Sequence, residues 1–254
     1  MEALWSRAVG SVSPGIVELV GTSLVQILSF WVPSLVYLTL DSVAPKFANK
    51  YKIQPAPKQP SKAEIWHCAE VVVGNQALTA IIKVAELSAL YALGIGSFYR
   101  VDKQLPSLAE IIRDFTLCVL GAEIIFYYGH RLLHHPRFYS RIHKKHHQFT
   151  APIAPTAQYS HPLEHILSNV IPLALPPQIL QCHIITFWLF LGCALFETVT
   201  VHSGFDFFSG CVRMHDLHHE KFSINYGSLG FLDLAHGTFA MNIKPKKKLA
   251  GQSP

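Results

Sequence analysis

The sequence is poor in charge and lacks any recognisable cysteine pattern. Only 15% of its 254 residues are Asp, Glu, Lys or Arg, whereas soluble domains carry about a quarter. Its five cysteines form no C-x-x-C pair, which argues against a disulfide framework and a thiolate metal site. Its basic residues do not gather into one patch, so no nucleic-acid partner is expected. A hydrophobic content of 50% excludes a disordered chain and points to a membrane protein.

The sequence instead contains several long apolar segments. Residues 19–40 contain no Asp, Glu, Lys or Arg, and this length crosses a bilayer core of about 30 Å. Pro33 within the run is expected to kink the helix. A second run, residues 71–99, contains Lys83 and Glu86, which lie three residues apart on one helix face. We expect these two charges to pair with each other or to face protein.

Two further apolar runs predict more crossings. Residues 115–128 are interrupted by a single glutamate, and residues 166–196 contain no formal charge. The latter stretch is too long for one crossing and is broken by Pro172 and by the pair Pro176 and Pro177. It therefore predicts a helical hairpin that returns to its starting side. Together the runs indicate an all-α bundle of about four spanning segments.

The distribution of lysine predicts which loops share a side of the membrane. Residues 41–62 contain five lysines, whereas the loop around Arg100 and Lys103 is short and less basic. Lysine and arginine favour the cytosolic side of a membrane protein. The linker is therefore expected in the cytosol, together with the histidine-rich region two crossings later and the basic C-terminal tail.

Histidine is the residue present in excess. Fourteen of the 15 histidines lie between His130 and His236, and eight form the clusters HRLLH (130–134), HKKHH (143–147) and HDLHH (215–219). On a helix, residues i, i+3 and i+4 share a face, whereas neighbours such as His146 and His147 are about 100° apart. Each member of a neighbouring pair can therefore reach a different metal. The pattern favours two metals over one.

The remaining histidines are weaker candidates. His161 and His165 form another i, i+4 pair within HPLEH, and His202 begins the segment HSGFDFF. His161 precedes a proline, so it either binds metal or caps the following segment. We interpret three other histidines as structural: His135, His183 and His236.

Spacing alone does not identify the metal, because imidazole suits Zn, Cu, Fe and Ni. Zinc proteases place a glutamate in H-E-x-x-H, whereas residues 130–134 enclose one arginine and two leucines. A site of many histidines at a membrane surface favours redox iron over hydrolytic zinc.

The same segments resemble a known family. HRLLH, HKKHH and HDLHH, with AQYSHPLEH and HSGFDFF between them, resemble the sterol desaturase/fatty acid hydroxylase superfamily. HRLLHHPRFY, TAPI, HPLEH and GSLGFLDLAHGT are most similar to its 4-methylsterol oxidase branch. The resemblance implies an all-α integral membrane helical bundle with a cytosolic histidine-rich helical cap. It covers about residues 110–240 and implies a fatty acid hydroxylase-like di-iron domain over residues 108–240. The apolar runs and the lysines, rather than the resemblance, predict that residues 1–107 anchor the chain through two spanning helices and a basic linker and that residues 241–254 form a basic tail.

The resemblance also implies a ligand set for two non-haem irons. The implied ligands are His130, His134, His143, His146, His147, His202, His215, His218 and His219. His161 and His165 are further candidates. Asp216 and Glu164 are expected to accept hydrogen bonds from ligand imidazoles and so orient them.

The activity implied by the resemblance is oxygen-dependent hydroxylation of a lipid in the endoplasmic reticulum membrane. Electrons would come from NAD(P)H through a reductase and a small haem protein of the cytochrome b5 type. The substrate would be a sterol-like lipid, oxidised at a 4-methyl group in sterol biosynthesis, that enters from the bilayer. The aromatic residues Phe187, Trp188, Phe190 and Phe196 would either wall its pocket or face lipid.

Two alternatives to this activity remain open at this point. One is a hydroxylase or desaturase of another lipid, or of a terpenoid or polyketide. The other is an inactive metal-binding membrane scaffold, against which the complete histidine clusters argue, since a decayed enzyme is expected to lose ligands.

Overall fold

The structure is a computed structural model that describes residues 2–54, 59–207 and 210–241. Pro55, Pro57 and Lys58 of the basic linker lie outside the described residues. The predicted basic tail, residues 241–254, also lies outside them except for Met241.

The described residues form helices joined by short loops, with two isolated bridges and no strand. This arrangement confirms the predicted all-α class. The helices are α1 (Glu2–Ser11), α2 (Pro14–Gln26), η1 (Ile27–Trp31), α3 (Val32–Val43), α4 (Pro45–Tyr51), α5 (Lys62–Ala92), α6 (Leu108–Leu133), α7 (Pro136–Tyr139), η2 (His143–Gln148), η3 (Ala154–Gln158), α8 (Pro162–Glu164), η4 (His165–Val170), α9 (Ile171–Ile179), α10 (Ile184–Val201), α11 (Cys211–Lys221) and α12 (Phe231–His236).

Three helices are long and apolar enough to cross a membrane: Pro14–Val43, Lys62–Ala92 and Ile184–Val201. The third run expected from the sequence lies in α6, which also contains Glu110, Arg113 and Asp114 and is not one of the three. Half of the most apolar window of α10 is buried, against 11% and 17% for the other two helices. Helix α10 is therefore the central helix, and α2–α3 and α5 expose apolar faces to the bilayer.

The spanning helix Pro14–Val43 deviates from α-helical geometry just before Pro33, where the sequence predicted a kink. A π-helical turn, η1, precedes the proline, and the N–H of Val32 bonds the carbonyl of Ile27. Pro33 then lies in the first turn of α3. The wider turn accommodates the missing N–H of the proline, because it shifts the hydrogen bonds by one residue.

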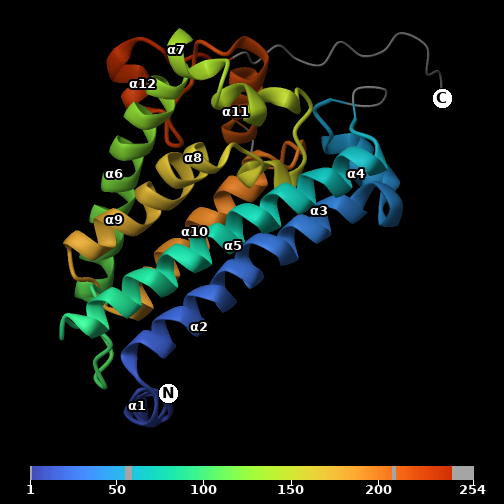
Figure 1. Ribbon diagram of the computed structural model, residues 1–254. Coiled ribbons are helices and arrows are strands. Elements are labelled where there is room, and N and C mark those ends of the chain that lie inside the picture. Colours follow the sequence, from blue (N-terminus) through green and yellow to red (C-terminus); the bar gives the residue numbers. More distant parts are fainter. Residues whose placement is uncertain (1, 55–58, 208–209, 242–254) are drawn as a thin grey trace, which may run out of the picture.

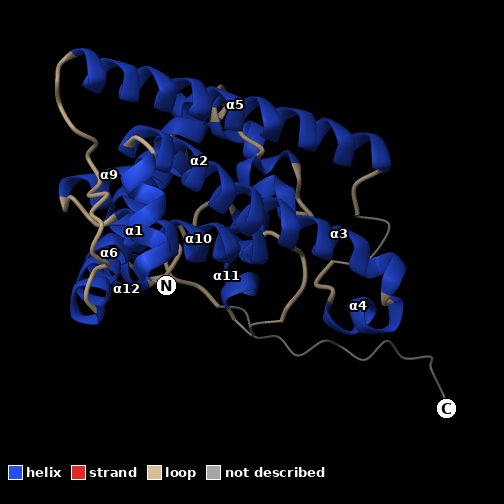
Figure 2. Ribbon diagram, turned by 90° about the horizontal axis from the view of Figure 1, so that it is seen from below, coloured by secondary structure: helices blue, strands red, loops and turns tan. Residues whose placement is uncertain are grey.

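The helices divide the molecule into two ends. Figure 1 shows α7, α11 and α12 gathered at one end of the bundle and α1 at the other. Seen from below in Figure 2, α5 runs along one edge and α10 lies inside the bundle. The histidine clusters belong to α6, η2 and α11, so they lie at the end that holds α7 and α12.

Backbone hydrogen bonds place the basic linker at the histidine end. The N–H of Ile53 bonds the carbonyl of Gly204 at 3.0 Å, just beyond the C-terminus of α10. At the other end, the N–H of Arg100 bonds the carbonyl of Cys182 at 3.0 Å. The linker and the histidines therefore share one end, as the lysine distribution predicts, and the loop around Arg100 lies at the opposite end.

The predicted hairpin is present, but its turn is not at the prolines. Pro176 and Pro177 lie inside α9, and the chain reverses at residues 180–183. Gln181 adopts a left-handed conformation there, with φ 48°. The helix continues past the prolines because their carbonyls still accept hydrogen bonds from Leu180 and Cys182, at 3.1 and 3.0 Å. A proline removes only the bond toward the preceding turn.

The expected pairing of Lys83 and Glu86 is also present. The Nζ atom of Lys83 lies 3.1 Å from Glu86 Oε2, and it lies 2.9 Å from Glu18 Oε1 on α2. The sequence did not predict this second partner. Helices α2 and α5 are therefore joined by a shared lysine within the membrane, where an unpaired charge would be costly.

Candidate metal centre

Four elements bring the histidines together at one end of the bundle. His130 and His134 stand at the C-terminus of α6, one helical turn apart. His202 is the C-cap residue of α10. The remaining ligands of the predicted set come from η2 and α11.

The spacing argument assumed that the HKKHH cluster is α-helical, but the structure shows that it is not. Residues 143–148 form a 3-10 helix, η2. A 3-10 helix has 3.0 residues per turn, so side chains at i and i+3 eclipse each other. The rings of His143 and His146 accordingly stack 5.5 Å apart. His147 then points about 120° away from His146, which still separates the neighbouring pair.

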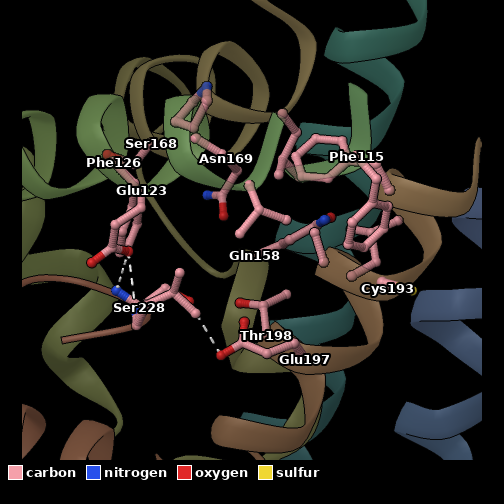
Figure 3. Close-up of a pocket in the computed structure, with 18 residues that line it drawn as sticks. Phe115, Glu123, Phe126, Gln158, Ser168, Asn169, Cys193, Glu197, Thr198 and Ser228 are labelled. Carbon is pink, nitrogen blue, oxygen red and sulfur yellow. Dashed lines mark hydrogen bonds between the residues drawn. The ribbon is translucent and has the colours of Figure 1, made fainter. Parts of the chain in front are cut away.

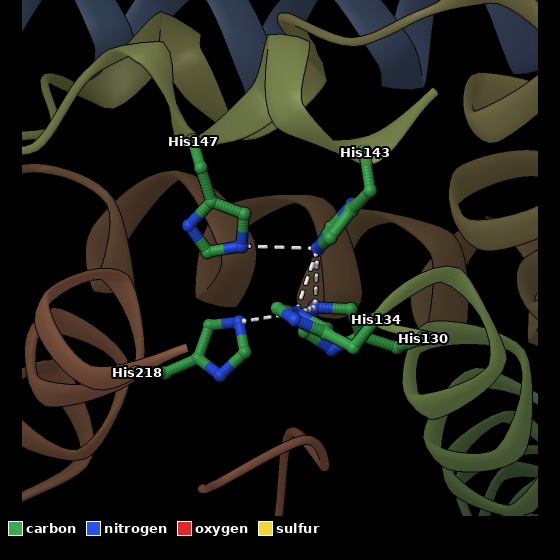
Figure 4. Close-up of side chains that lie close together, drawn as sticks. All are labelled: His130, His134, His143, His147 and His218. Atoms are coloured by element: carbon green, nitrogen blue, oxygen red, sulfur yellow. Dashed lines mark hydrogen bonds between the residues drawn. The ribbon is translucent and has the colours of Figure 1, made fainter. Parts of the chain in front are cut away.

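Five histidines form the first group, which we call the five-histidine group. Its members are His130, His134, His143, His147 and His218, and their ligand atoms lie within 4.8 Å of one another. Figure 4 shows the rings converging from three sides. The Nε2 atoms of His143 and His134 are 2.8 Å apart, and those of His134 and His218 are 3.2 Å apart. The five Nε2 atoms therefore surround one small space.

Four more histidines form the four-histidine group: His146, His202, His215 and His219. The Nε2 atoms of His215 and His202 are 2.8 Å apart, and those of His219 and His215 are 3.0 Å apart. The geometry thus divides each neighbouring pair, because His147 and His218 belong to one group and His146 and His219 to the other. The ring centroids of His147 and His219 are only 4.6 Å apart, so the two groups are adjacent.

Backbone carbonyls orient two imidazoles of the five-histidine group. The Nδ1–H groups of His130 and His218 donate to the carbonyls of Tyr226 and Ile224, each at 2.7 Å. The carboxylate of Asp233, which is fully buried, accepts from the N–H of Tyr226 at 2.8 Å and holds this loop. A proton on Nδ1 leaves a lone pair on Nε2, so these contacts direct lone pairs into the group.

The four-histidine group is arranged in the same way. The Nδ1–H of His202 donates to the carbonyl of Thr198 at 2.7 Å, and that of His146 donates to the carbonyl of Tyr159 at 3.3 Å. Burial lowers the pKa of His146 to about 4 and the pKa of His202 to about 3. Both imidazoles are therefore neutral near pH 7, which is the form that binds metal.

A buried carboxylate orients His143. Glu164 Oε1 on α8 lies 2.7 Å from Nδ1 of His143, and its side chain is 4% exposed. Burial raises the pKa of Glu164 well above its usual value. A divalent cation on the imidazole would favour the ionised carboxylate, because opposite charges stabilise each other across the ring. A carboxylate, a histidine and a metal in series are a common arrangement in metal sites.

Replacing Glu164 with alanine is expected to weaken metal binding by about ten- to a hundredfold, because His143 loses the partner that orients it. Metal retained after dialysis against a chelator measures the effect. Glu220→Ala is the matched control, because the side chain of Glu220 is 61% exposed and pairs with Lys221 at the surface of α11. Equal retention in both variants would contradict the role of Glu164.

The structure places His161 and His165 outside both groups. Nδ1 of His161 accepts the N–H of Leu163 at 3.2 Å, which is the capping role left open above. His165 Nε2 lies 3.0 Å from Thr79 Oγ1 on α5. Oδ1 of Asp216 accepts from Gln54 of the linker at 2.8 Å, so this aspartate joins α11 to the linker.

The histidines interpreted as structural have distinct contacts. His135 and His183 cap α7 and α10, where their Nδ1 atoms accept backbone N–H groups at 3.3 and 3.2 Å. His236 Nε2 lies 3.0 Å from the hydroxyl of Tyr128. Three of the six histidines outside the groups therefore cap helices: His135, His161 and His183.

Sequence reasoning missed Ile224 and Tyr226, in the loop between α11 and α12, and Asp233 on α12. Ile224 and Tyr226 contribute carbonyl oxygens, which every residue type possesses, so their role leaves no signal in the sequence. Asp233 lies in GSLGFLDLAHGT, a segment quoted above only for its family resemblance. Its isolated carboxylate did not indicate that it holds the loop.

A cavity of ≈230 Å³ lies between α6, η4, α9 and α10. On α6 its lining follows one face, Phe115, Val119, Ala122, Glu123 and Phe126, and the next residue of that face is His130. On α10 it follows Phe190, Ala194 and Thr198, and the next residue is His202. The cavity is therefore lined by the helix faces that lead to both histidine groups. Figure 3 shows its polar and aromatic side chains.

Of the four aromatic residues expected either to wall a pocket or to face lipid, one lines the cavity. Phe190 lines the cavity. Phe187 stacks on Tyr99 with ring centroids 4.3 Å apart, and Trp188 donates to Thr22 on α2 at 3.1 Å. Phe196 is 46% exposed. Phe187 follows the cavity face of α10 but lies one turn below Phe190, where it packs on Tyr99, and Trp188 and Phe196 lie on other faces.

The donor set fits two metal ions with an affinity for imidazole. Five and four neutral nitrogen donors converge at two adjacent points, and the opposite ring nitrogens of several of these imidazoles are hydrogen-bonded. Nδ1 of His147 and Nδ1 of His219 are buried without a partner in the described chain. Burying so many imidazoles together is costly unless a cation binds them.

Comparison with known proteins identifies the family. A profile described as fatty acid hydroxylase matches residues 115–238. Fatty acid hydroxylase domain-containing protein 2 of Macaca fascicularis is 34% identical over 94% of this chain and 73% of its own length. A putative methylsterol monooxygenase of Dictyostelium discoideum is 34% identical over 82% of this chain and 80% of its own.

A third relative is named for a different activity from the first two. A very-long-chain aldehyde decarbonylase of Oryza sativa subsp. japonica is 30% identical over 99% of this chain and 88% of its own. No solved structure matches the chain. Both histidine groups and the cavity lie within residues 115–238, the region that matches the profile. The macaque and Dictyostelium relatives also align with most of this chain. The chain therefore belongs to the fatty acid hydroxylase family.

Proposed function

We propose that the protein is a membrane-bound, oxygen-dependent hydroxylase that oxidises a sterol-like lipid with two non-haem irons. The observation that carries the proposal is the pair of adjacent histidine groups with five and four inward-facing nitrogens. Each group offers more imidazoles than the three that hold a catalytic zinc. Neutral donors leave the charge of the metal intact, which suits an oxidant. When bound, two irons supply the activation of O2 and the oxidation of a C–H bond.

The residues of the chain would hold and shield this chemistry. The carbonyls of Tyr226 and Thr198 fix one imidazole in each group. The cavity would direct a substrate toward His130 and His202, which follow its lining residues Phe126 and Thr198 on α6 and α10. Its largely apolar lining excludes water from the reacting carbon.

The size of the cavity supports a substrate that remains partly in the bilayer. At ≈230 Å³ it is smaller than the roughly 300 Å³ at which sites for whole small molecules begin. It therefore encloses only the reacting end of a lipid. Cys193, which lines it, is exposed on α10 at the level of the membrane, where the rest of the lipid can lie.

The names of several relatives favour a sterol. Besides the Dictyostelium protein, methylsterol monooxygenase 1 of Gallus gallus is 29% identical over 80% of this chain. The rice decarbonylase and the fatty acid hydroxylase ahd1 of Mycosarcoma maydis, which is 37% identical over 77% of this chain, favour a long-chain lipid instead. We take oxidation of a 4-methylsterol as the first candidate and of another lipid as the second.

Deleting the protein is expected to make a 4-methylsterol accumulate severalfold, while hydroxylated fatty acids stay at their normal level. Lipid profiling of the deletion strain by mass spectrometry measures this. Re-expression of the wild-type chain should reverse the accumulation, and His218→Ala should not. Unchanged sterols together with one missing hydroxylated lipid would favour the second candidate. A fully restored profile with His218→Ala would favour an inactive scaffold.

The histidine end is proposed to face the cytosol from the endoplasmic reticulum membrane. The lysines of the linker and the hydrogen bond between Ile53 and Gly204 support this orientation, because they connect the most basic loop with that end. Electrons would then come from cytosolic NAD(P)H through a reductase and a small haem protein of the cytochrome b5 type.

A cysteine introduced at Gln104 is expected to be protected from a membrane-impermeant maleimide in intact microsomes, whereas one at Ser140 is expected to react. The physical reason is that the two positions lie at opposite ends of the bundle. Both cysteines should react after detergent is added, which controls for accessibility. Reaction of both positions in intact microsomes would contradict the orientation.

A further inference from the structure

A cluster of polar side chains lies in the part of the cavity nearest the histidines. Ser228 donates from its hydroxyl to Oε1 of Glu197 on α10 at 3.3 Å. Glu123 on α6 accepts the N–H groups of Ser228 and Leu229 at 2.9 and 3.1 Å. The side chain of Asn169, from η4, points toward the same space (Figure 3).

Several polar atoms of this cluster have no protein partner. Among the described residues, the amide of Asn169 and the second carboxylate oxygen of Glu197 have no protein partner, and both side chains are half-buried and line the cavity. The hydroxyl of Ser168, a residue 8% exposed that also lines the cavity, is buried without a partner. A polar atom without a hydrogen-bond partner is unfavourable in an apolar surrounding. A ligand that hydrogen-bonds them would remove this cost.

The local backbone presents these side chains to the cavity. Ser168 and Asn169 belong to η4, a π-helical turn of residues 165–170. A π turn inserts one extra residue and shifts the helix face, and such turns are frequent at functional sites. Two consecutive residues therefore both line the cavity.

The cluster is close to the metal groups along both helices. Glu197 precedes His202 by five residues and Glu123 precedes His130 by seven, which correspond to rises of about 8 and 10 Å. Phe115, at the other end of the cavity, is about 22 Å below His130. A polar group of the substrate held by the cluster would thus lie near the carbon that is oxidised.

The chemistry of the cluster selects among polar groups. No lysine or arginine is among the described residues that line the cavity, and two carboxyl groups are. A carboxylate or phosphate would therefore find no cationic partner among the described lining residues. An ammonium has only donors and would leave the NH2 of Asn169 unmatched. A hydroxyl both donates and accepts, so it matches Glu197 and Asn169 together.

We propose that Glu197 and Asn169 bind a hydroxyl group of the lipid substrate, close in the molecule to the carbon that is oxidised. The assignment rests on the proposed function, since it takes the cavity as the substrate site. It adds the prediction that the substrate is an alcohol, with no acid or phosphate group at this position.

The test measures the binding of matched lipids to the full-length protein in nanodiscs. The probes are a 4-methylsterol and its 3-deoxy and 3-amino analogues, and an octadecanol with its alkane. Binding is followed by scintillation proximity with tritiated probes. The wild-type protein is expected to bind the hydroxylated sterol about tenfold more tightly than the deoxy analogue, the factor associated with one buried hydrogen bond.

Substitutions at two positions test the hydroxyl site independently. Glu197→Leu and Asn169→Leu are each expected to reduce the tenfold preference to about twofold or less, because each removes one partner. Glu197→Gln retains a donor and an acceptor and should keep most of the preference. Cys193→Ala changes an apolar part of the same cavity, so it should affect the hydroxylated and deoxy probes equally. Iron content measures whether each variant is folded.

The outcomes separate this proposal from the proposed function. Equal binding of the hydroxylated and deoxy sterols by the wild-type protein would overturn the hydroxyl site and leave the sterol proposal standing. A preference for octadecanol that Glu197→Leu removes, without sterol binding, would support the hydroxyl site and overturn the sterol. Tighter binding of the amino analogue, or a preference unchanged in both leucine variants, would overturn the hydroxyl site.

Discussion

Replacing His218 with alanine is expected to abolish turnover and to lower bound iron from about two atoms per chain to about one. His218 belongs to the five-histidine group, where its Nε2 atom lies 3.2 Å from that of His134. Loss of residues that only orient ligands costs about ten- to a hundredfold, so loss of a ligand should cost more than a hundredfold in activity. His146→Ala should have the same effect through the four-histidine group.

Elemental analysis and turnover of the purified variants measure this prediction. His135→Ala is the control, because His135 caps α7 and belongs to neither group. It should keep both irons. One metal per chain in the wild-type protein prepared with iron, or full activity of both ligand variants, would contradict two metal sites. Zinc in an overexpressed sample would not, since metal supply decides the occupancy of imidazole sites.

Replacing Gly21 with alanine is expected to lower the apparent melting temperature by roughly 10 °C, equivalent to about 3 kcal/mol. A Cβ atom at Gly21 would lie 1.9 Å from Cζ2 of Trp188 on α10. The ring cannot move easily, because its N–H donates to Thr22 at 3.1 Å and it packs edge-on against Trp5. Helix α2 would therefore be forced away from the central helix.

Thermal unfolding in detergent, followed by circular dichroism, measures the loss. Gly74→Ala on α5 is the matched control, because a Cβ there meets nothing within 4 Å. It should stabilise the helix by up to about 1 kcal/mol. The double variant Gly21→Ala, Trp188→Leu should recover part of the lost stability. Equal melting temperatures for Gly21→Ala and the wild type would contradict close packing of α2 on α10.

Much of the fold was predictable because it follows from local composition. Apolar runs of sufficient length predicted the helices that now form α2–α3, α5 and α10. The lysines of the linker predicted that it shares an end with the histidines, and the bond from Ile53 to Gly204 agrees. The turn of the hairpin was misplaced, because a proline weakens only the preceding hydrogen bonds and does not by itself end a helix.

The histidine site was partly predictable for the same reason. Spacing within HRLLH, HKKHH and HDLHH is a local property, and it indicated that neighbouring histidines diverge around a helix axis. It could not indicate that η2 is a 3-10 helix, or that the imidazole paired with Glu164, an acceptor expected from the sequence, is that of His143. The capping role of His161 also depends on a backbone turn that spacing does not reveal.

The sequence by itself determined the class of the protein, an all-α membrane chain with imidazole clusters, because hydropathy and helical spacing act over a few neighbouring residues. Only the tertiary structure decided how nine histidines from four elements divide into groups of five and four. It alone placed Asn169, Glu197 and Ser228 in one cavity beneath them. Such contacts join residues as far apart as 169 and 228, and they are set by the packing of α6, α9 and α10, which no local pattern encodes.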